Sequence, residues 1–124
     1  MTSRTKTWAR PVVGFEIQAQ DPERTSAFYR EMFEWNIAPG AVPGFLSIEH
    51  GIGAPEGGIG GVISTAAGSS RIAIFVQVSD LRASLALTEE LGGSVVMQPL
   101  DVPNGPTVAR IKDPEGNLLG LVQQ

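Results

Sequence analysis

The feature of this sequence that most restricts its fold is a unit that occurs twice. In residues 11–20, "PVVGFEIQAQ", apolar and polar residues alternate, which is typical of a strand with one buried face. Residues 71–80, "RIAIFVQVSD", show the same alternation. Asp21 follows the first stretch and Asp80 ends the second, and an Asp in this place accepts hydrogen bonds from the free N–H groups of a helix's first turn. The sequence therefore predicts a strand followed by a capped helix in each half.

Both predicted helices show apolar residues at helical spacing. The first lies within residues 21–35, where Pro22 suits the first helical position, and the second lies within 80–93, where a Gly-Gly pair ends it. Residues that recur on one side of a helix usually face the core. We expect this of Phe28, Met32 and Trp35 in the first helix and of Leu81, Leu85 and Leu91 in the second.

Three extended segments follow each helix, separated by Pro-Gly, Asn-Gly and Asp-Pro-Glu-Gly-Asn turn signals. The last of these, "DPEGN" at 113–117, is predicted to be the hairpin turn between the final two strands. Each half therefore has the order β-α-β-β-β, which makes the protein α+β. The segments are 35–39, 45–50 and 59–65 in the first half and 94–100, 107–112 and 117–123 in the second.

Length and composition predict one domain over residues 1–124 and exclude several classes of function. We expect a first module at about 11–66, a second at about 71–123 and an N-terminal arm at 1–10. The chain has no cysteine, which excludes disulfides and a cysteine nucleophile and suits a cytoplasmic protein. Its net charge is -4 and no basic cluster follows residue 10, so we expect no nucleic-acid partner. No apolar run is long enough to span a bilayer, so we expect no membrane partner.

Three segments together resemble a known family. They are "FEIQAQDPERTSAFYREMFEW", "VSDLRASLALTEELGGSVV" and "DPEGNLLGLV". The chain resembles the glyoxalase / bleomycin resistance / extradiol dioxygenase superfamily, also called vicinal oxygen chelate proteins, over roughly residues 11 to 123. The resemblance implies two tandem βαβββ modules whose mixed sheet curls into a cup around a ligand, with the helices outside. It also implies a homodimer.

The resemblance also implies a divalent metal held by side chains that face into the cup. The corresponding positions are Gly14, Ala73, Gly120 and one position in strand 59–65. Divalent ions need oxygen or imidazole donors, and Gly and Ala side chains have none. Strand 59–65 has no carboxylate, His or Gln. We therefore expect no metal, no cofactor and none of the family's metal-dependent chemistry.

Strand alternation selects the residues that face the cup and could contact a ligand. Glu16, Gln18 and Gln77 offer polar groups there, or else they stand in water at its mouth. Phe75 offers a ring on which a flat ligand can stack. The net charge and Glu16 suit a cationic ligand, and Phe75 suits an aromatic one. The candidate ligand-binding residues are Gly14, Glu16, Gln18, Ala73, Phe75, Gln77, Arg110 and Gly120.

The direction of Arg110 stays open at this stage because the register of strand 107–112 cannot be read from alternation. If Arg110 faces the cup, it pairs with Glu16 or holds an anionic ligand with its planar guanidinium. If it faces outward, it is a surface charge.

His50 is the only histidine, so a metal site built from several histidines is impossible. A lone His at a strand end is either a proton carrier or a surface residue, and the second is the commoner case. The Gly-rich stretch 51–61 lacks the Gly-Lys-Ser/Thr of a phosphate-binding loop. It is a candidate lid over the cup.

These observations predict a metal-free small-molecule binding protein that resembles the sequestering, resistance-type members of the superfamily. The alternative is a lyase, isomerase or dioxygenase-like enzyme whose chemistry has moved to Glu16, His50 or an unusual metal site. A third hypothesis is a structural or regulatory dimer. The sequence leaves open whether the protein is an enzyme, and its catalytic residues are unknown.

Overall fold

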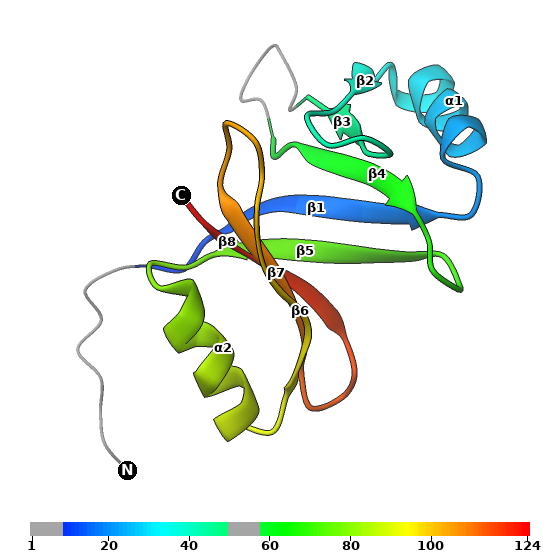
Figure 1. Ribbon diagram of the computed structural model, residues 1–124. Coiled ribbons are helices and arrows are strands. Elements are labelled where there is room, and N and C mark those ends of the chain that lie inside the picture. The colour runs from blue at the N-terminus through cyan, green and yellow to red at the C-terminus, as the bar shows by residue number, and fades with distance from the viewer. Residues whose placement is uncertain (1–8, 50–57) are drawn as a thin grey trace.

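The computed structural model describes residues 9–49 and 58–124. Two successive modules share one order of elements, and each begins with a strand followed by a helix (Figure 1). The first module consists of β1 (Val12–Ala19), α1 (Pro22–Phe33), β2 (Ile37–Pro39), β3 (Leu46–Ile48) and β4 (Gly61–Thr65). The second consists of β5 (Arg71–Gln77), α2 (Leu81–Glu90), β6 (Ser94–Asp101), β7 (Thr107–Lys112) and β8 (Leu118–Gln123).

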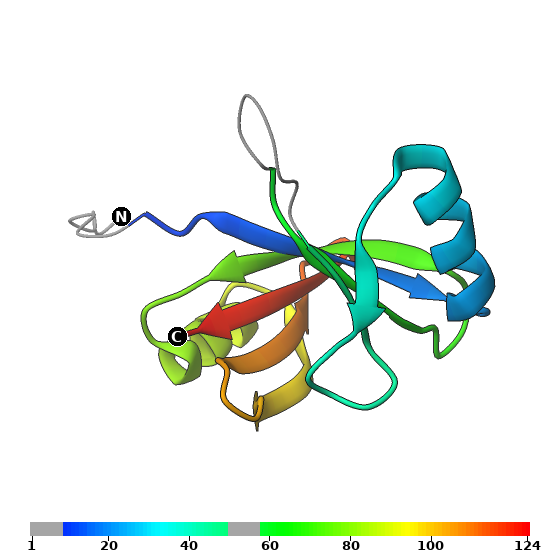
Figure 2. The same ribbon diagram turned by 90° about the horizontal axis from the view of Figure 1, so that it is seen from above.

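All the described strands join in one sheet with the order β2-β3-β4-β1-β5-β8-β7-β6. The modules meet where β1 runs antiparallel to β5, while β4 lies parallel to β1 and β8 lies parallel to β5. The sheet curls, and α1 and α2 lie on its outside (Figure 2). The predicted α+β class, the curved mixed sheet and the order of elements are confirmed.

Both helices begin as the sequence predicts. The Asp21 carboxylate accepts a hydrogen bond from the Arg24 N–H at 3.1 Å, and the Asp80 carboxylate accepts one from the Ala83 N–H at 3.0 Å. These bonds satisfy N–H groups that have no partner within the helix. No helix in 9–49 or 58–124 is both long and apolar enough to cross a membrane.

The hairpin between β7 and β8 is built around Asp113. Its Oδ1 accepts hydrogen bonds from the Glu115 and Asn117 N–H groups, both at 2.9 Å, and its Oδ2 accepts one from the Asn117 side chain at 2.9 Å. Gly116 has a φ of 88°, a left-handed conformation that glycine adopts without strain. The predicted turn is confirmed.

Two apolar clusters lie between the sheet and the helices, one under each helix. Part of the expected core is wrong, because Phe28 is 59% exposed, Met32 63% and Leu91 66%. The buried side of α1 passes through Ser26, which is fully buried, rather than through Phe28 and Met32. Leu91 is the C-cap of α2 and lies beyond its last buried turn. The clusters are Ile17, Ala19, Ile37, Ile48 and Ile63 under α1, and Val78, Leu81, Leu85, Ala109 and Leu121 under α2.

Candidate functional site

The site predicted from the sequence lies on the face of the sheet that is turned away from both helices, which we call the inner face. On β1, Ile17 and Ala19 belong to the cluster under α1, so the alternate residues Glu16 and Gln18 lie on the inner face. On β5, Val76 packs against the cluster under α2, so Phe75 lies on the inner face. We call the opposite side the outer face.

The strand register brings the predicted residues together. Phe75 pairs with Gly14 on one side and with Gly120 on the other, and Gly120 pairs in turn with Arg110. Two residues further along β1 and β5, Glu16 pairs with Ala73. Gln18 and Gln77 lie on the inner face at opposite ends of this group, where Gln18 pairs with Arg71 and Gln77 pairs with Val122. All eight candidate residues therefore stand on β1, β5, β8 and β7.

An ion pair crosses the inner face. Arg110 Nη2 donates a hydrogen bond to Glu16 Oε2 at 2.7 Å. β1 and β7 are separated by β5 and β8, a distance of about 14 Å in a flat sheet. The intervening strands present Ala73 and Gly120 at the paired positions, where a longer side chain would stand between the two charges. The contact settles the direction of Arg110, which faces the cup and pairs with Glu16.

Both oxygen atoms of Glu16 accept hydrogen bonds. Its Oε2 also accepts a hydrogen bond from Ser64 Oγ at 2.9 Å, and its Oε1 accepts one from the Gln18 side chain at 3.4 Å. The Glu16 side chain is only 1% exposed. A buried carboxylate is tolerated when it is both paired with a charge and hydrogen-bonded, and these three donors meet that condition.

Ser64 is the residue of this network that was missed in the sequence. A serine hydroxyl is not one of the usual metal ligands, so the absence of carboxylate, His and Gln from strand 59–65 did not point to it. Alternation along this strand was the available signal. In the structure, Ser64 on β4 pairs with Gln18 on the parallel strand β1 and lies on the inner face.

Arg110 has hydrogen-bond donors that its bond to Glu16 does not use. A guanidinium has five N–H groups, and one of them is used by Glu16. The side chain is 22% exposed, and its Nε is buried with no hydrogen-bond partner in the part of the chain that the structure describes. An unpaired arginine donor beside a satisfied carboxylate favours an incoming acceptor oxygen.

The family's metal does not fit these residues. A Cβ atom placed on Gly120 would overlap the ring of Phe75, and one placed on Gly14 would stand 3.9 Å from Phe75 Cδ2. The ring therefore occupies the space beside Gly120 into which a metal-binding side chain would have to extend. Within residues 9–49 and 58–124, no three His, Cys, Asp or Glu side chains come together as a metal site. His50 and most of the candidate lid at 51–61 lie outside the described residues.

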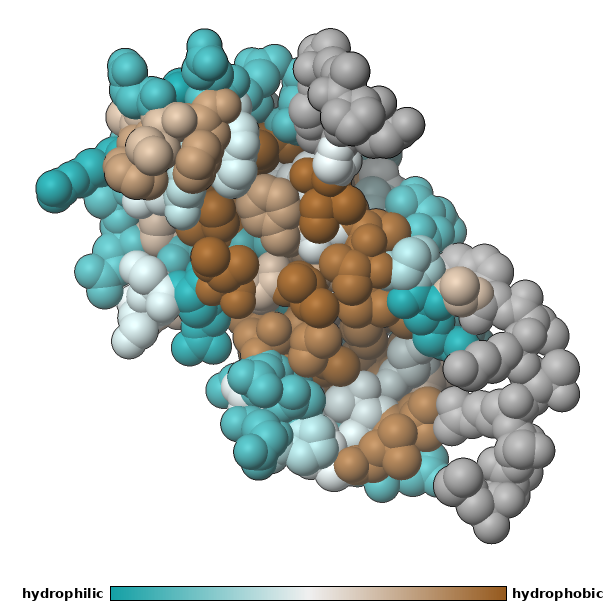
Figure 3. Space-filling view, turned by 180° about the vertical axis from the view of Figure 1, so that it is seen from behind, coloured by the Kyte–Doolittle hydropathy of each residue, from teal (hydrophilic) through white to brown (hydrophobic). Residues whose placement is uncertain are grey.

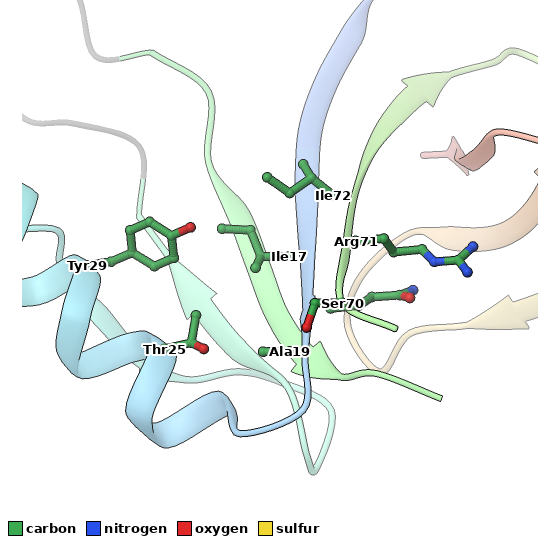
Figure 4. Close-up of a pocket in the computed structure, with 8 residues that line it drawn as sticks. Ile17, Ala19, Thr25, Tyr29, Ser70, Arg71 and Ile72 are labelled. Atoms are coloured by element: carbon green, nitrogen blue, oxygen red, sulfur yellow. The ribbon is translucent and has the colours of Figure 1, made fainter. Parts of the chain in front are cut away.

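A hollow of about 310 Å³ opens on the outer face beside α1, and the sequence did not predict it. Tyr29 and Thr25 on α1 face Ile17 and Ile72 on β1 and β5 across this space (Figure 4). The hollow is open to solvent on the other side of the sheet from the Glu16 pair. It is lined by Ile17, Gln18, Ala19, Thr25, Tyr29, Ser70, Arg71 and Ile72.

Comparison with known proteins agrees with this architecture. A family model described as a glyoxalase-like domain matches residues 14–122. A search of curated proteins found no match.

Three of the similar solved structures come from different bacteria. A glyoxalase/bleomycin resistance protein/dioxygenase superfamily member from Vibrio splendidus is 14% identical, with a TM-score of 0.64, and the match covers 94% of this chain and 100% of the other. A methylmalonyl-CoA epimerase from Streptomyces coelicolor is 17% identical, with a TM-score of 0.62 and coverages of 91% and 93%. A Mn(II)-bound glyoxalase from Novosphingobium aromaticivorans is 22% identical, with a TM-score of 0.61 and coverages of 92% and 38%. Likeness at these identities shows a shared fold.

Proposed function

We propose that this chain, which belongs to the glyoxalase-like family of the glyoxalase/bleomycin resistance/dioxygenase superfamily, binds a small molecule on its inner face. It does so without the family's metal ion. The ligand is held where the two modules meet. We place the protein in the cytoplasm, a setting that suits a chain without cysteine.

The observation that supports this proposal is the Glu16–Arg110 ion pair on the inner face. Taking two charges out of water costs free energy, and well-packed apolar residues in their place would stabilise a sheet at least as well. We infer that the pair serves recognition, since stability alone does not account for charges placed on this face. The pair also joins the modules, since Glu16 lies on β1 and Arg110 on β7.

The donors of the site indicate which ligands it accepts. Arg110 already pairs with the charge of Glu16, and both carboxylate oxygens accept hydrogen bonds, so we place an acidic ligand before the cationic ligand that the sequence suggested. Arg110 retains unused N–H groups, which pair best with a carboxylate or another acceptor oxygen. Phe75 adds a flat apolar surface on the same face. We therefore propose a ligand that has an acidic or carbonyl oxygen attached to an aromatic or apolar body.

This proposal can be tested by NMR titration of isotope-labelled, EDTA-treated protein with benzoate and, separately, with benzylamine. We expect benzoate to shift signals of Arg110, Phe75 and Gln18 in a saturable way and benzylamine to leave them in place. The matched variant is Arg110→Met, which retains a long apolar side chain and should lose the response to benzoate. Stronger binding of benzylamine, or an unchanged response in Arg110→Met, would show that the assigned donors are wrong.

A second candidate function is an enzyme that works without the family's metal. It is favoured by the presence of methylmalonyl-CoA epimerases and a glyoxalase among the solved structures with this fold and by the carboxylate of Glu16 on the inner face. A general base must be free to take a proton from its substrate. Because three donors already hold Glu16, we place binding before catalysis. If wild type turns over a carbonyl substrate and Glu16→Gln does not, catalysis would take the place of binding as the proposed function.

A further inference from the structure

The centre of the inner face is positively charged, although the chain as a whole is negative. The four strands of the candidate site, β1, β5, β8 and β7, carry four charged residues, and alternation places all of them on the inner face. One is the carboxylate of Glu16, and the others are the cations Arg71, Arg110 and Lys112. The net charge of these four residues is therefore +2, while that of the chain is -4.

The outer side of the same strands has the opposite character. On β5, Ile72 and Ile74 alternate with Arg71 and Ala73 and therefore face outward. Apolar residues gather across the middle of the outer face (Figure 3). These strands thus keep their charged side chains on the face that holds the candidate site, and a surface lined mainly by one sign of charge attracts ligands of the other sign.

Arg71 brings a second guanidinium to the inner face, besides that of Arg110. Arg110 is paired with Glu16, whereas the Arg71 side chain makes no ion pair or hydrogen bond within residues 9–49 and 58–124. Arg71 also borders the hollow on the outer face, but Figure 4 shows its side chain extending away from Tyr29 and Thr25. Its planar set of N–H donors is therefore open to an acceptor oxygen that arrives on the inner face.

The strand register places Arg71 close to the Glu16–Arg110 pair. On the antiparallel strands β1 and β5, Glu16 pairs with Ala73, and Gln18 pairs with Arg71. Arg71 is therefore a diagonal neighbour of Glu16, a position about 7–8 Å away in such a strand pair and within reach of a long side chain. Arg110 Nη2 lies 2.7 Å from Glu16 Oε2. Two arginines thus stand beside one carboxylate, which neutralises only one of them.

We propose that Arg71 is a second anion-binding residue of the inner face, and that the ligand carries two acidic groups on its aromatic or apolar body. Arg110 holds one acidic group and Arg71 holds the other, while Lys112 adds positive charge to the same face. The small side chain of Ala73, which lies between Arg71 and Phe75 on the inner side of β5, leaves room for the body of the ligand. This inference rests on the proposed function and specifies its ligand as a dianion.

The test compares two ligands of the same shape. Terephthalate has a carboxylate at each end of a benzene ring, and in 4-carbamoylbenzoate an uncharged amide replaces one of them. Each is titrated into isotope-labelled, EDTA-treated protein and followed by NMR at low ionic strength, because salt screens an exposed ion pair. We expect wild type to bind terephthalate about fivefold more tightly, the upper end for an exposed pair. The side-chain signal of Arg71 should shift with terephthalate and stay in place with 4-carbamoylbenzoate.

Two variants make the same substitution on opposite sides of the sheet. In Arg71→Met the two ligands should bind with similar affinity, because the second cation is gone. The matched control is Arg82→Met, which removes one positive charge from an exposed position on α2 and should keep the fivefold difference. Circular dichroism establishes that both variants are folded.

The outcomes separate this inference from the proposed function. Equal affinity of wild type for the two ligands, with both shifting the Arg110 signals, would overturn the role of Arg71 and leave the proposed function standing. Failure of wild type to bind either ligand would overturn both. A preference for terephthalate that survives in Arg71→Met, or that Lys112→Met removes in its place, would assign the second acidic group to another cation and would likewise overturn the role of Arg71.

Discussion

Arg110 on β7 and Glu16 on β1 form a hydrogen-bonded ion pair of 2.7 Å across two intervening strands. The contact connects the second module to the first on the side away from the helices. It requires a curled sheet and small residues at Ala73 and Gly120 beneath it. Ala73 and Gly120 also lack metal-binding atoms. The small side chains that leave room for the ion pair are therefore the same ones that remove the metal donors.

Arg110→Met is expected to destabilise the fold by about 3 kcal/mol, because it leaves the Glu16 carboxylate buried without its cation. The free energy of unfolding in urea measures this loss. The double variant Glu16→Gln/Arg110→Met should recover much of it, since no buried charge remains. A single variant as stable as wild type would show that the pair is solvated and has no structural role.

Ser64→Ala removes a hydrogen bond to the buried carboxylate and should cost about 1–2 kcal/mol of unfolding free energy. Thr65→Ala, the neighbouring exposed hydroxyl on β4, is the matched control and should cost less than about 0.5 kcal/mol. Equal losses in the two variants would mean that strand propensity, and not the bond to Glu16, is being measured.

Gly120→Glu places a carboxylate at the family's metal position but drives it into the ring of Phe75. We expect a loss of about 2–3 kcal/mol from overpacking, measured by urea unfolding. Phe75→Ala in the same chain should relieve part of this loss, although each change is harmful alone. If Gly120→Glu is as stable as wild type, the ring does not fill that space.

Asp113 provides a pH-dependent contribution to the β7–β8 turn. The Asn117 side chain, followed by backbone N–H groups of the turn, holds the pKa of the Asp113 carboxyl below its ordinary value of 3.8. A carboxyl with a lowered pKa in the folded state adds stability that is complete above the ordinary pKa and is lost as the pH falls through the folded one. The stability difference between wild type and Asp113→Asn should therefore shrink as the pH drops below 3.8.

An NMR titration of the Asp113 carboxyl gives the same answer directly. A midpoint at or above 3.8 would contradict the assigned hydrogen bonds.

The elements of the fold follow from local signals in the sequence. Asp21 and Asp80 cap the helices, and Asp113 builds the last turn, because each acts through hydrogen bonds to residues two to four positions away. Alternation on β1 and β5 correctly separates the helix-covered residues from those on the inner face. The hydrogen bonds and the alternation involve residues that are close together in the sequence, so one sequence is enough to predict them.

The Glu16 network was not predictable in the same way. Glu16 and Arg110 are 94 positions apart, and their contact depends on the register of four strands and on the curl of the sheet. Alternation left Arg110 free to face either side until its pairing with Gly120 was known. The wrong prediction that Phe28 and Met32 face the core has another cause. These two residues lie on the same side of α1, and the buried Ser26 lies on a different side. Periodicity shows that a helix has an apolar stripe, and it does not show what covers that stripe.

The most direct test of the account is a calorimetric titration of metal-stripped wild-type protein with Mn²⁺, alongside metal analysis of protein purified without chelators. We predict no saturable binding of the ion and a metal content well below one per chain, because Gly14, Ala73 and Gly120 have no donor atoms and Phe75 fills the space beside Gly120. One Mn²⁺ bound per chain, and lost in Glu16→Gln, would contradict the account.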